Sequence, residues 1–465
     1  MTSVQNHHPP LSGNKFALLV LLLTSLLALS CASSKPSSRV LNPTRTKPTA
    51  SKPKVDPNKV DTVSWTVLDE DTYPPISNEM VIESNPLLRP IRNVSMLIPF
   101  EANGSNTTLS RSEEKFGHFY AGALVAIEEL EELDQMMNIS VFDTGRDENK
   151  VRRILQNMDV RQSDVIVGPY ETPILKAVAN WGQQNEIPVV SPWRSSSNIA
   201  ENNLYYYQVR PLIEQYFESI LRDALSKYSP ENIFIINEEG SSDDSRVRAL
   251  HRIHEMLNRG KISTPLNEYP IVADSIQNSD FMLFDSLLMD HPKAALIIPN
   301  YSSRDSRYVY SLIRKLNAEI DEEEIEIYGM PTLVNARRLD LEFFRSLDLN
   351  TVDFKYIDPE KKEVVSFIQR YLDKFGHLPT EDSYHGYDIM MLLANNSNYA
   401  LNRGSSELFR NIPLLSMGVS FQRYHKDRLA NRGLLPSRKP GDFMVNSNLK
   451  LIEFHDNRFR AVPIR

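Results

Sequence analysis

Two short apolar segments of the sequence each end at a residue followed by proline, and polar side chains come directly after both. The first ends at Gly168-Pro169 and the second at Ser191-Pro192. Proline removes a backbone donor and forces a turn, so each segment is expected to stop there as a strand. Thr172 is then expected to cap a helix whose first residue is Pro173. The three serines at 195–197 follow the second strand in the same way.

Hydroxyl groups at helix starts can donate hydrogen bonds to a bound molecule, in particular to one that carries negative charge. If the two strands are parallel neighbours, Thr172 and Ser195 lie at one edge of a sheet and face one crevice. The alternative interpretation is ordinary strand termination and helix capping. Because two such ends follow one another, the pattern favours a binding site.

The surrounding sequence alternates between strand and helix patterns. Strands are expected at 93–100, 138–145, 164–169 and 187–192, and helices at 112–133, 148–158 and 172–185. A second set comprises strands at 232–237, 294–300 and 324–331, and helices at 244–257 and 304–317. Such alternation predicts α/β units with parallel sheets covered by helices on both faces. Two sets of similar size in a 465-residue chain predict two lobes with a cleft between them.

Composition and motifs exclude several classes of function. The chain is 41% hydrophobic and 24% charged with a net charge of −8, so it lacks the basic excess of a nucleic-acid binder. No phosphate-binding loop, dinucleotide fingerprint or nucleophile elbow follows an expected strand. His251 and His254 stand one helical turn apart without a third metal ligand nearby. We therefore expect no catalytic residue, no metal and no cofactor.

The single cysteine, Cys31, follows an apolar run from Phe16 to Leu29 that Lys15 precedes. The run is short for a membrane span and is typical of a secretory signal. The residues Leu27-Ala28-Leu29-Ser30-Cys31 resemble a bacterial lipobox, which implies cleavage before Cys31 and attachment of lipid to its thiol. A plain signal peptide or an N-terminal anchor helix is the alternative. With that thiol lipidated, the mature chain could form no disulfide.

The segments after the signal indicate how the chain is organised. Residues 1–31 are expected to be the signal, and residues 32–90 a flexible tether rich in Ser, Pro and Lys with a transition into the folded part. The first lobe is expected to comprise 91–211 with about 341–416. The second is expected to comprise 212–340 with about 417–465.

The strand ends and the flanking segments together resemble a known family. The stretches 97–100, 119–130, 164–197 and 205–211, and later "IYGMPTLVN" and "GVSFQRY", are similar to type I periplasmic binding proteins of the leucine/isoleucine/valine-binding kind. The similarity is greatest to a lipoprotein branch typical of Bacteroidetes. The resemblance implies two α/β lobes joined by three crossovers that close on a small molecule.

The resemblance also implies which residues contact the ligand. The positions that hold a ligand carboxylate after the third and fourth strands correspond to Thr172, Trp193 and Ser195, and the aromatic that covers the ligand from the second lobe to Tyr301. Arg194 would favour an anionic or polar ligand, unless it is simply a surface arginine. The family's acid for the ligand ammonium is absent from 329–332, which argues against an α-amino acid.

Two classes of function remain open. The first is a periplasmic lipoprotein that binds a small polar solute for a transporter or for sensing. The second is an adaptor that has lost its ligand and regulates a peptidoglycan synthase, because outer-membrane lipoprotein activators of such synthases carry a similar domain. A polar, aromatic-lined cleft favours the first, and a cleft filled by its own side chains the second. Ala32 and Ser33 are not the acidic residues linked to retention in the inner membrane, which favours the outer membrane.

Overall fold

The computed structural model describes most of the chain after residue 90. The described residues are 91–101, 111–239, 244–258, 264–276, 282–321, 323–333, 341–395, 414–426 and 442–464. They all belong to one compact unit, Glu79–Arg465. The expected signal, the lipidation site Cys31 and the tether at 32–90 lie outside the described residues.

The first lobe is built on a seven-stranded sheet with the order β11-β12-β5-β4-β3-β1-β2. Its strands are β1 (Asn93–Ile98), β2 (Asn138–Asp143), β3 (Val165–Val167), β4 (Val189–Ser191), β5 (Tyr206–Gln208), β11 (Phe421–Tyr424) and β12 (Phe443–Asn446). All neighbouring pairs are parallel except β11 with β12. Because β3 pairs directly with β4, the two strands that end at proline stop side by side, as predicted.

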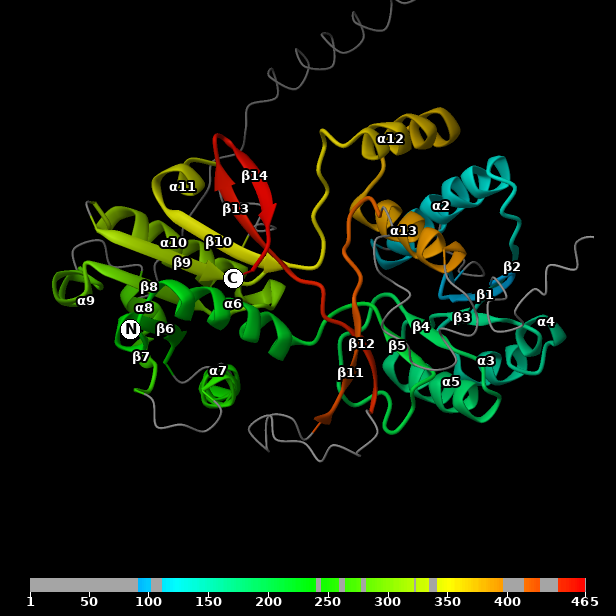
Figure 1. Cartoon of the computed structure of the whole chain (residues 1–465), viewed down its shortest axis with the longest axis horizontal. Coiled ribbons are helices and arrows are strands. Elements are labelled where there is room, and N and C mark those ends of the chain that lie inside the picture. The colour runs from blue at the N-terminus through cyan, green and yellow to red at the C-terminus, as the bar shows by residue number, and fades with distance from the viewer. Residues whose placement is uncertain are drawn as a thin grey trace, which may run out of the picture. The chain divides into compact units, whose positions relative to one another are not determined.

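Helices cover both faces of this sheet (Figure 1). They are α2 (Arg111–Glu132), α3 (Glu148–Ile154), α4 (Met158–Arg161), α5 (Thr172–Gln184), α12 (Lys362–Phe375) and α13 (Glu381–Ala394). Alternate residues of a strand point to opposite faces. Accordingly Met96 and Ile98 of β1 pack in one core cluster with α2 and α13, whereas Leu97 packs in another with α5.

The second lobe has a sheet with the order β14-β13-β10-β9-β8-β6-β7. Its strands are β6 (Ile233–Glu238), β7 (Asn267–Ile271), β8 (Lys293–Ile298), β9 (Glu324–Gly329), β10 (Asp348–Asp353), β13 (Lys450–His455) and β14 (Arg458–Val462). Strands β6 to β10 are parallel, and β13 is antiparallel to both β10 and β14. The helices are α6 (Ile213–Lys227), α7 (Asp244–Leu257), α8 (Ala273–Ile276), α9 (Asp285–Asp290), α10 (Ser306–Glu319) and α11 (Leu341–Ser346), with short 3₁₀ turns η3 (Pro230–Asn232) and η4 (Ser303–Asp305).

The chain passes between the lobes three times: after β5, after β10 and after β12. The expected lobe boundaries differ from this pairing in two places. Strand β10 lies within 341–416 but pairs with β9 in the second sheet, and β11 and β12 lie within 417–465 but extend the first sheet beside β5. A local hydrophobic pattern identifies a strand without identifying its neighbour, so it cannot predict which sheet each of these strands joins.

The expected helix at 148–158 is divided into α3 and α4. The side chain of Asn157 accepts a hydrogen bond from the backbone N of Asp159 at 2.8 Å and caps a new helix. Asparagine competes well for such a capping position, so it interrupts a helix whose apolar spacing continues through it.

Helices α2 and α13 touch at their backbones. A Cβ atom at Gly122 would lie 1.8 Å from the carbonyl oxygen of Ser383, and one at Gly386 would lie 1.8 Å from that of Phe119. Only glycine fits at these two positions. The close approach buries nearly the whole of α13.

Candidate functional site

The order of the first sheet creates a point at which a ligand can bind. Strand β1 lies between β2 and β3, so the chain runs to one side of β1 and then returns to the other. Loops at such a switch point diverge and leave a crevice at the carboxyl ends of the strands. The loops that contribute described residues are 99–101, 144–147, 168–171 and 192–196, and we call them the first-sheet edge.

Charged side chains from three strands meet at this edge. Nε of Arg146, after β2, contacts the carboxylate of Glu101, after β1, and lies 3.3 Å from Oε1 of Glu171, after β3. Both oxygens of Glu171 are buried and accept no hydrogen bond from another described residue, so the positive charges of Arg146 and Arg194 stabilise this carboxylate. The network therefore spans the switch point, and the two carboxylate oxygens of Glu171 can still accept hydrogen bonds there.

The Glu171 carboxylate is not fully compensated for the water it has lost. Burial raises its pKa above the ordinary value, although its own backbone amide and the charges of Arg146 and Arg194 oppose the rise. A raised pKa means that the fold disfavours the ionised form. A hydrogen-bond donor or a positive group on a ligand would stabilise the ionised carboxylate.

The backbone at the first-sheet edge is held in left-handed conformations. Glu101 has φ 54°, Gly145 has φ 55°, Arg146 has φ 53° and Gly168 has φ 89°. Oδ1 of Asp143 organises two of these loops, because it accepts hydrogen bonds from Glu101 N at 3.1 Å and Gly145 N at 2.9 Å. Positive φ at non-glycine residues costs free energy and is concentrated at functional sites.

The pKa of Asp143 shows how firmly this carboxylate is held. Burial alone would raise the pKa, but the hydrogen bonds from Gly145, Lys150 and Glu101 lower it overall. The carboxylate therefore remains ionised and keeps the two loops in place at neutral pH.

A cluster of packed aromatic rings lies beside the first-sheet edge. Trp193 is 5% exposed and packs edge-on against Phe116, Phe119 and Tyr170, with ring centroids 5.3, 4.8 and 6.2 Å away. Arg194 is half-buried: its Nε donates to the carbonyl of Tyr170 at 2.6 Å, and its guanidinium lies 3.9 Å from the centre of the Tyr170 ring. Arg194 is therefore a fixed cation at the edge and not a freely solvated one.

Two local predictions at this edge are wrong. The N-cap of α5 is Glu171, without a side-chain capping bond, and Thr172 is the half-buried first residue of the helix. No helix begins at Ser195, because the chain continues without one to β5. The Ser195 hydroxyl instead donates to the carbonyl of Pro211 at 2.6 Å. The backbone N of Ser196 donates to Gln208, so side-chain contacts with the following strand replace a helical turn.

Tyr301 lies at the corresponding point of the second sheet. There β6 stands between β7 and β8, and Tyr301 follows β8. Its ring is 48% exposed, and the guanidinium of Arg246 from α7 lies 4.3 Å from the ring centre. Nη1 of Arg246 also pairs with Oδ2 of Asp305 at 3.1 Å. Both sheets therefore present an arginine on a tyrosine at their switch points.

Sequence reasoning missed four residues of the first-sheet edge, namely Glu101, Arg146, Tyr170 and Glu171. Each lies within two residues of the end of an expected strand, and that position is the signal that could have found them. Their pairing could not be foreseen, because strand order decides which loops meet.

Within the described residues no group of three or more His, Cys, Asp or Glu side chains could hold a metal ion. In the same part of the chain no helix has the length and apolar character needed to cross a membrane.

Two α/β lobes, three crossovers and polar groups at the carboxyl edges of both sheets define a type I periplasmic binding fold. The chain matches the receptor family ligand binding region over residues 123–431, which is more than half of its length, and it belongs to that family. No curated protein matches the chain.

Solved structures share the fold at low identity. One is a Rhodospirillum rubrum protein described as a branched-chain amino acid ABC transporter, with TM-score 0.56, 13% identity and coverage of 80% of this chain and 100% of that one. A branched-chain amino acid ABC transporter periplasmic ligand-binding protein from Burkholderia xenovorans has TM-score 0.51 and 11% identity, with 80% and 94% covered. Haemophilus influenzae LpoA has TM-score 0.52 and 12% identity over 81% of this chain and 59% of that one. At these identities the likeness concerns the fold alone.

Proposed function

We propose that the chain is a lipid-anchored periplasmic protein that binds a small polar ligand between its lobes, for transport or sensing, without catalysing a reaction. The observation that carries this proposal is the network of Glu101, Arg146 and Glu171 across the switch point, beside the fixed cation Arg194. Charged groups held at strained loops, with unused acceptors, are suited to bind a molecule and serve no evident need of the fold.

The arrangement suggests the character of the ligand. Two acids, Glu101 and Glu171, and two arginines, Arg146 and Arg194, lie at the edge, so the ligand should carry both hydrogen-bond donors and acceptors. In this proposal Thr172, Arg194 and Ser195 contact the ligand from the first lobe and Tyr301 covers it from the second. Trp193 supports Tyr170 from within the core. The acids at the edge make a purely anionic ligand less favourable than Arg194 alone suggested.

A thermal-shift screen tests the proposal, because a ligand that binds only the folded state raises Tm. The panel comprises amino acids, short peptides, nucleosides, sugars and muropeptides, and small molecules carried through native purification are identified by mass spectrometry. For a hit, Thr172→Ala or Ser195→Ala should weaken binding by about 0.5–1.5 kcal/mol at a neutral ligand group and about 1.5–3 kcal/mol at a charged one. Tyr301→Ala should weaken it through loss of apolar contact.

Tyr205→Ala provides the matched control, because Tyr205 lies half-buried at the opposite, amino end of β5. It should leave affinity unchanged. If a compound binds Thr172→Ala, Ser195→Ala and Tyr301→Ala with the affinity of the wild type, the proposed site is wrong. If no compound binds and a peptidoglycan synthase co-purifies with wild type and edge variants alike, the adaptor function is favoured instead.

A separate part of the proposal is that lipid attached to Cys31 anchors the chain in the outer membrane. Diacylglycerol transfer requires the thiol, so Cys31→Ser should yield an uncleaved and unlipidated precursor. Metabolic labelling with a fatty-acid analogue measures this directly, and Ser30→Ala serves as a neighbouring control that should still be labelled. Equal label on the Cys31→Ser variant and the wild type would disprove lipidation at this residue.

A further inference from the structure

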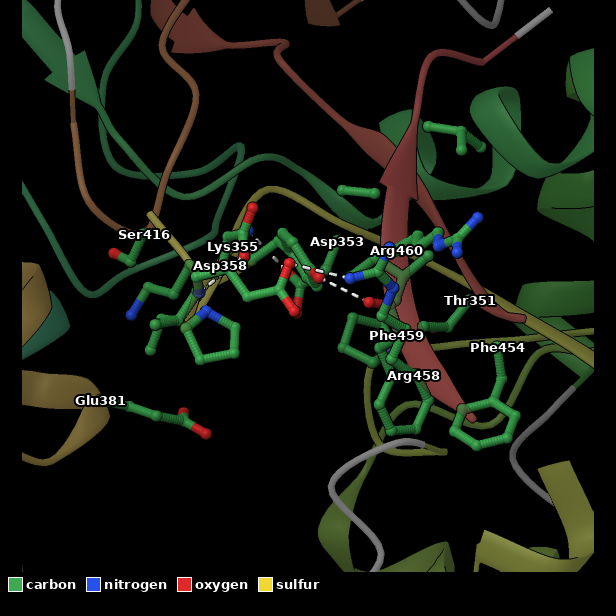
Figure 2. A pocket seen from close by; sticks show the side chains of 18 of the residues that line it. Thr351, Asp353, Lys355, Asp358, Glu381, Ser416, Phe454, Arg458, Phe459 and Arg460 are labelled. Atoms are coloured by element: carbon green, nitrogen blue, oxygen red, sulfur yellow. Dashed lines mark hydrogen bonds and ion pairs between the residues drawn. The ribbon is translucent and has the colours of Figure 1, made fainter. Parts of the chain in front are cut away.

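A cavity of about 820 Å³ lies between the second crossover and the C-terminal hairpin of β13 and β14 (Figure 2). One wall is the crossover from Lys355 to Glu360, and the other is β14 from Arg458 to Val462. None of the five residues proposed to contact or support the ligand lines it. It is therefore a feature separate from the first-sheet edge.

The cavity runs along the edge of β14. All five residues of this strand line it in succession. Alternate residues of a strand point to opposite faces, so a cavity that touches every residue follows the strand's edge and does not cover one face. Among the described strands β14 is an edge strand of its sheet, and β13 is its neighbour.

The register of the hairpin identifies which backbone groups point into the cavity. His455 pairs with Arg458 across a two-residue turn, so the hydrogen-bonded pairs of the ladder involve Arg458, Arg460 and Val462. The backbone groups of Phe459 and Ala461 therefore point away from β13. The hydroxyl of Tyr356 donates to the carbonyl of Phe459 at 2.6 Å, which confirms that direction.

The charges around the cavity are unbalanced. Nη1 of Arg458 pairs with Glu360 at 2.8 Å, and Nη2 of Arg460 pairs with Asp456 at 2.6 Å, so both arginines are occupied by nearby acids. The remaining lining carboxylates are Asp353, Asp358 and Glu381, and Lys355 is the other lining cation. These three carboxylates, from β10, the crossover and α13, are called the acidic wall; they outnumber Lys355, so the lining keeps a net negative charge.

The lining also offers apolar contact. Phe454 and Phe459 pack against each other with ring centroids 5.1 Å apart, and Ile452 and Ala461 pair beside them. Apolar side chains that alternate with basic ones would match this combination of apolar surface and acidic wall.

We propose that this cavity binds an extended peptide segment of a partner protein, which adds as a strand to β14 and places basic side chains toward Asp353, Asp358 and Glu381. The N–H of Phe459 and the N–H and C=O of Ala461 point away from β13 and supply main-chain hydrogen bonds, whereas the C=O of Phe459 already accepts from Tyr356. The acidic wall supplies selectivity for lysine or arginine. The proposal is independent of the small-ligand site, because the two share no residue.

The probe is a labelled heptapeptide in which valine and lysine alternate, with a valine–glutamate heptapeptide as its counterpart, measured by fluorescence anisotropy on the folded chain. The lysine peptide should bind and the glutamate peptide should not. Hydrogen exchange of the Phe459 and Ala461 amides in the wild type should slow when the lysine peptide is bound. Absence of binding, or binding that leaves both amides unprotected, would overturn strand addition.

Two variants test the geometry. Ala461→Pro removes an outward N–H that the ladder with β13 does not use, so the variant should fold. Its affinity for the lysine peptide should be about tenfold lower. Ala461→Ser keeps the N–H and should bind as the wild type does. Asp358→Asn combined with Glu381→Gln should reduce the preference for lysine over glutamate. If Ala461→Pro fails to fold, the double variant and the exchange measurement still decide, and unchanged selectivity in the double variant would refute the acidic wall.

Discussion

Replacing Gly122 or Gly386 by alanine is expected to lower the free energy of unfolding by about 3 kcal/mol, the upper end of the usual cost of overpacking. The added Cβ would stand 1.8 Å from a backbone carbonyl oxygen of the facing helix in either variant, and a backbone cannot rotate away as a side chain can. Helices α2 and α13 must therefore separate. Urea unfolding measures the loss as a lower midpoint.

Gly117→Ala is the matched control, because Gly117 belongs to the same helix α2 and has nothing within 4 Å of its added Cβ. Alanine there should stabilise the protein by about 0.5–1 kcal/mol, since glycine is the poorer helix former. If Gly122→Ala behaved like Gly117→Ala, the close helix contact would be wrong.

The separation of α2 from α13 should also change the structure of the first-sheet edge. Phe116 and Phe119 of α2 pack on Trp193, which in turn packs on Tyr170. A shift of α2 would therefore displace the ring under the guanidinium of Arg194. Any ligand found in the screen should bind more weakly to Gly122→Ala than to Gly117→Ala.

Asp388→Asn is expected to cost about 2–4 kcal/mol, because a charged acceptor that satisfies several buried donors is lost. Asp388 is fully buried in α13, and its carboxylate accepts hydrogen bonds from Leu415 N at 2.6 Å, Ser416 N at 2.8 Å, Ser416 Oγ at 2.6 Å and Met417 N at 3.2 Å. An asparagine has one acceptor oxygen, so its amide must face at least one of these donors. Segment 415–417 should then detach from α13.

The control for this change is Asp373→Asn on α12. Asp373 is exposed and accepts from Gln369 of the same helix at 2.8 Å, so its loss should change stability by less than about 0.5 kcal/mol. Denaturant unfolding at pH 8 compares the two variants. A wild-type midpoint for Asp388→Asn would show that these four bonds contribute little net stability.

The sequence by itself determined the α/β class, the positions of most strands and helices, and the points at which β3 and β4 end. These features depend on local causes. The spacing of apolar residues sets the type of element, and the prolines at 169 and 192 stop the strands. The same local signals placed Thr172 and Ser195 after the carboxyl ends of β3 and β4, where the structure also has them.

Local signals failed where capping groups compete. Asn157 divides an expected helix, and Ser195 bonds to Pro211 instead of starting one. At 148–158 the apolar spacing was compatible with one helix, and the side-chain hydrogen bond of Asn157 decided against it. Residues of this kind can serve helix and loop equally, so spacing alone cannot choose between them.

Only the tertiary structure decided which loops meet. The contacts of Arg146 with Glu101 and Glu171 exist because β1 lies between β2 and β3, and that order is a property of the whole sheet. Likewise β10 joins the second lobe and β11 and β12 the first, because pairing partners come from distant parts of the chain. Apolar periodicity records that a residue is buried but not by which neighbour, and the choice of neighbour gives this protein its charged edge and its acidic cavity beside β14.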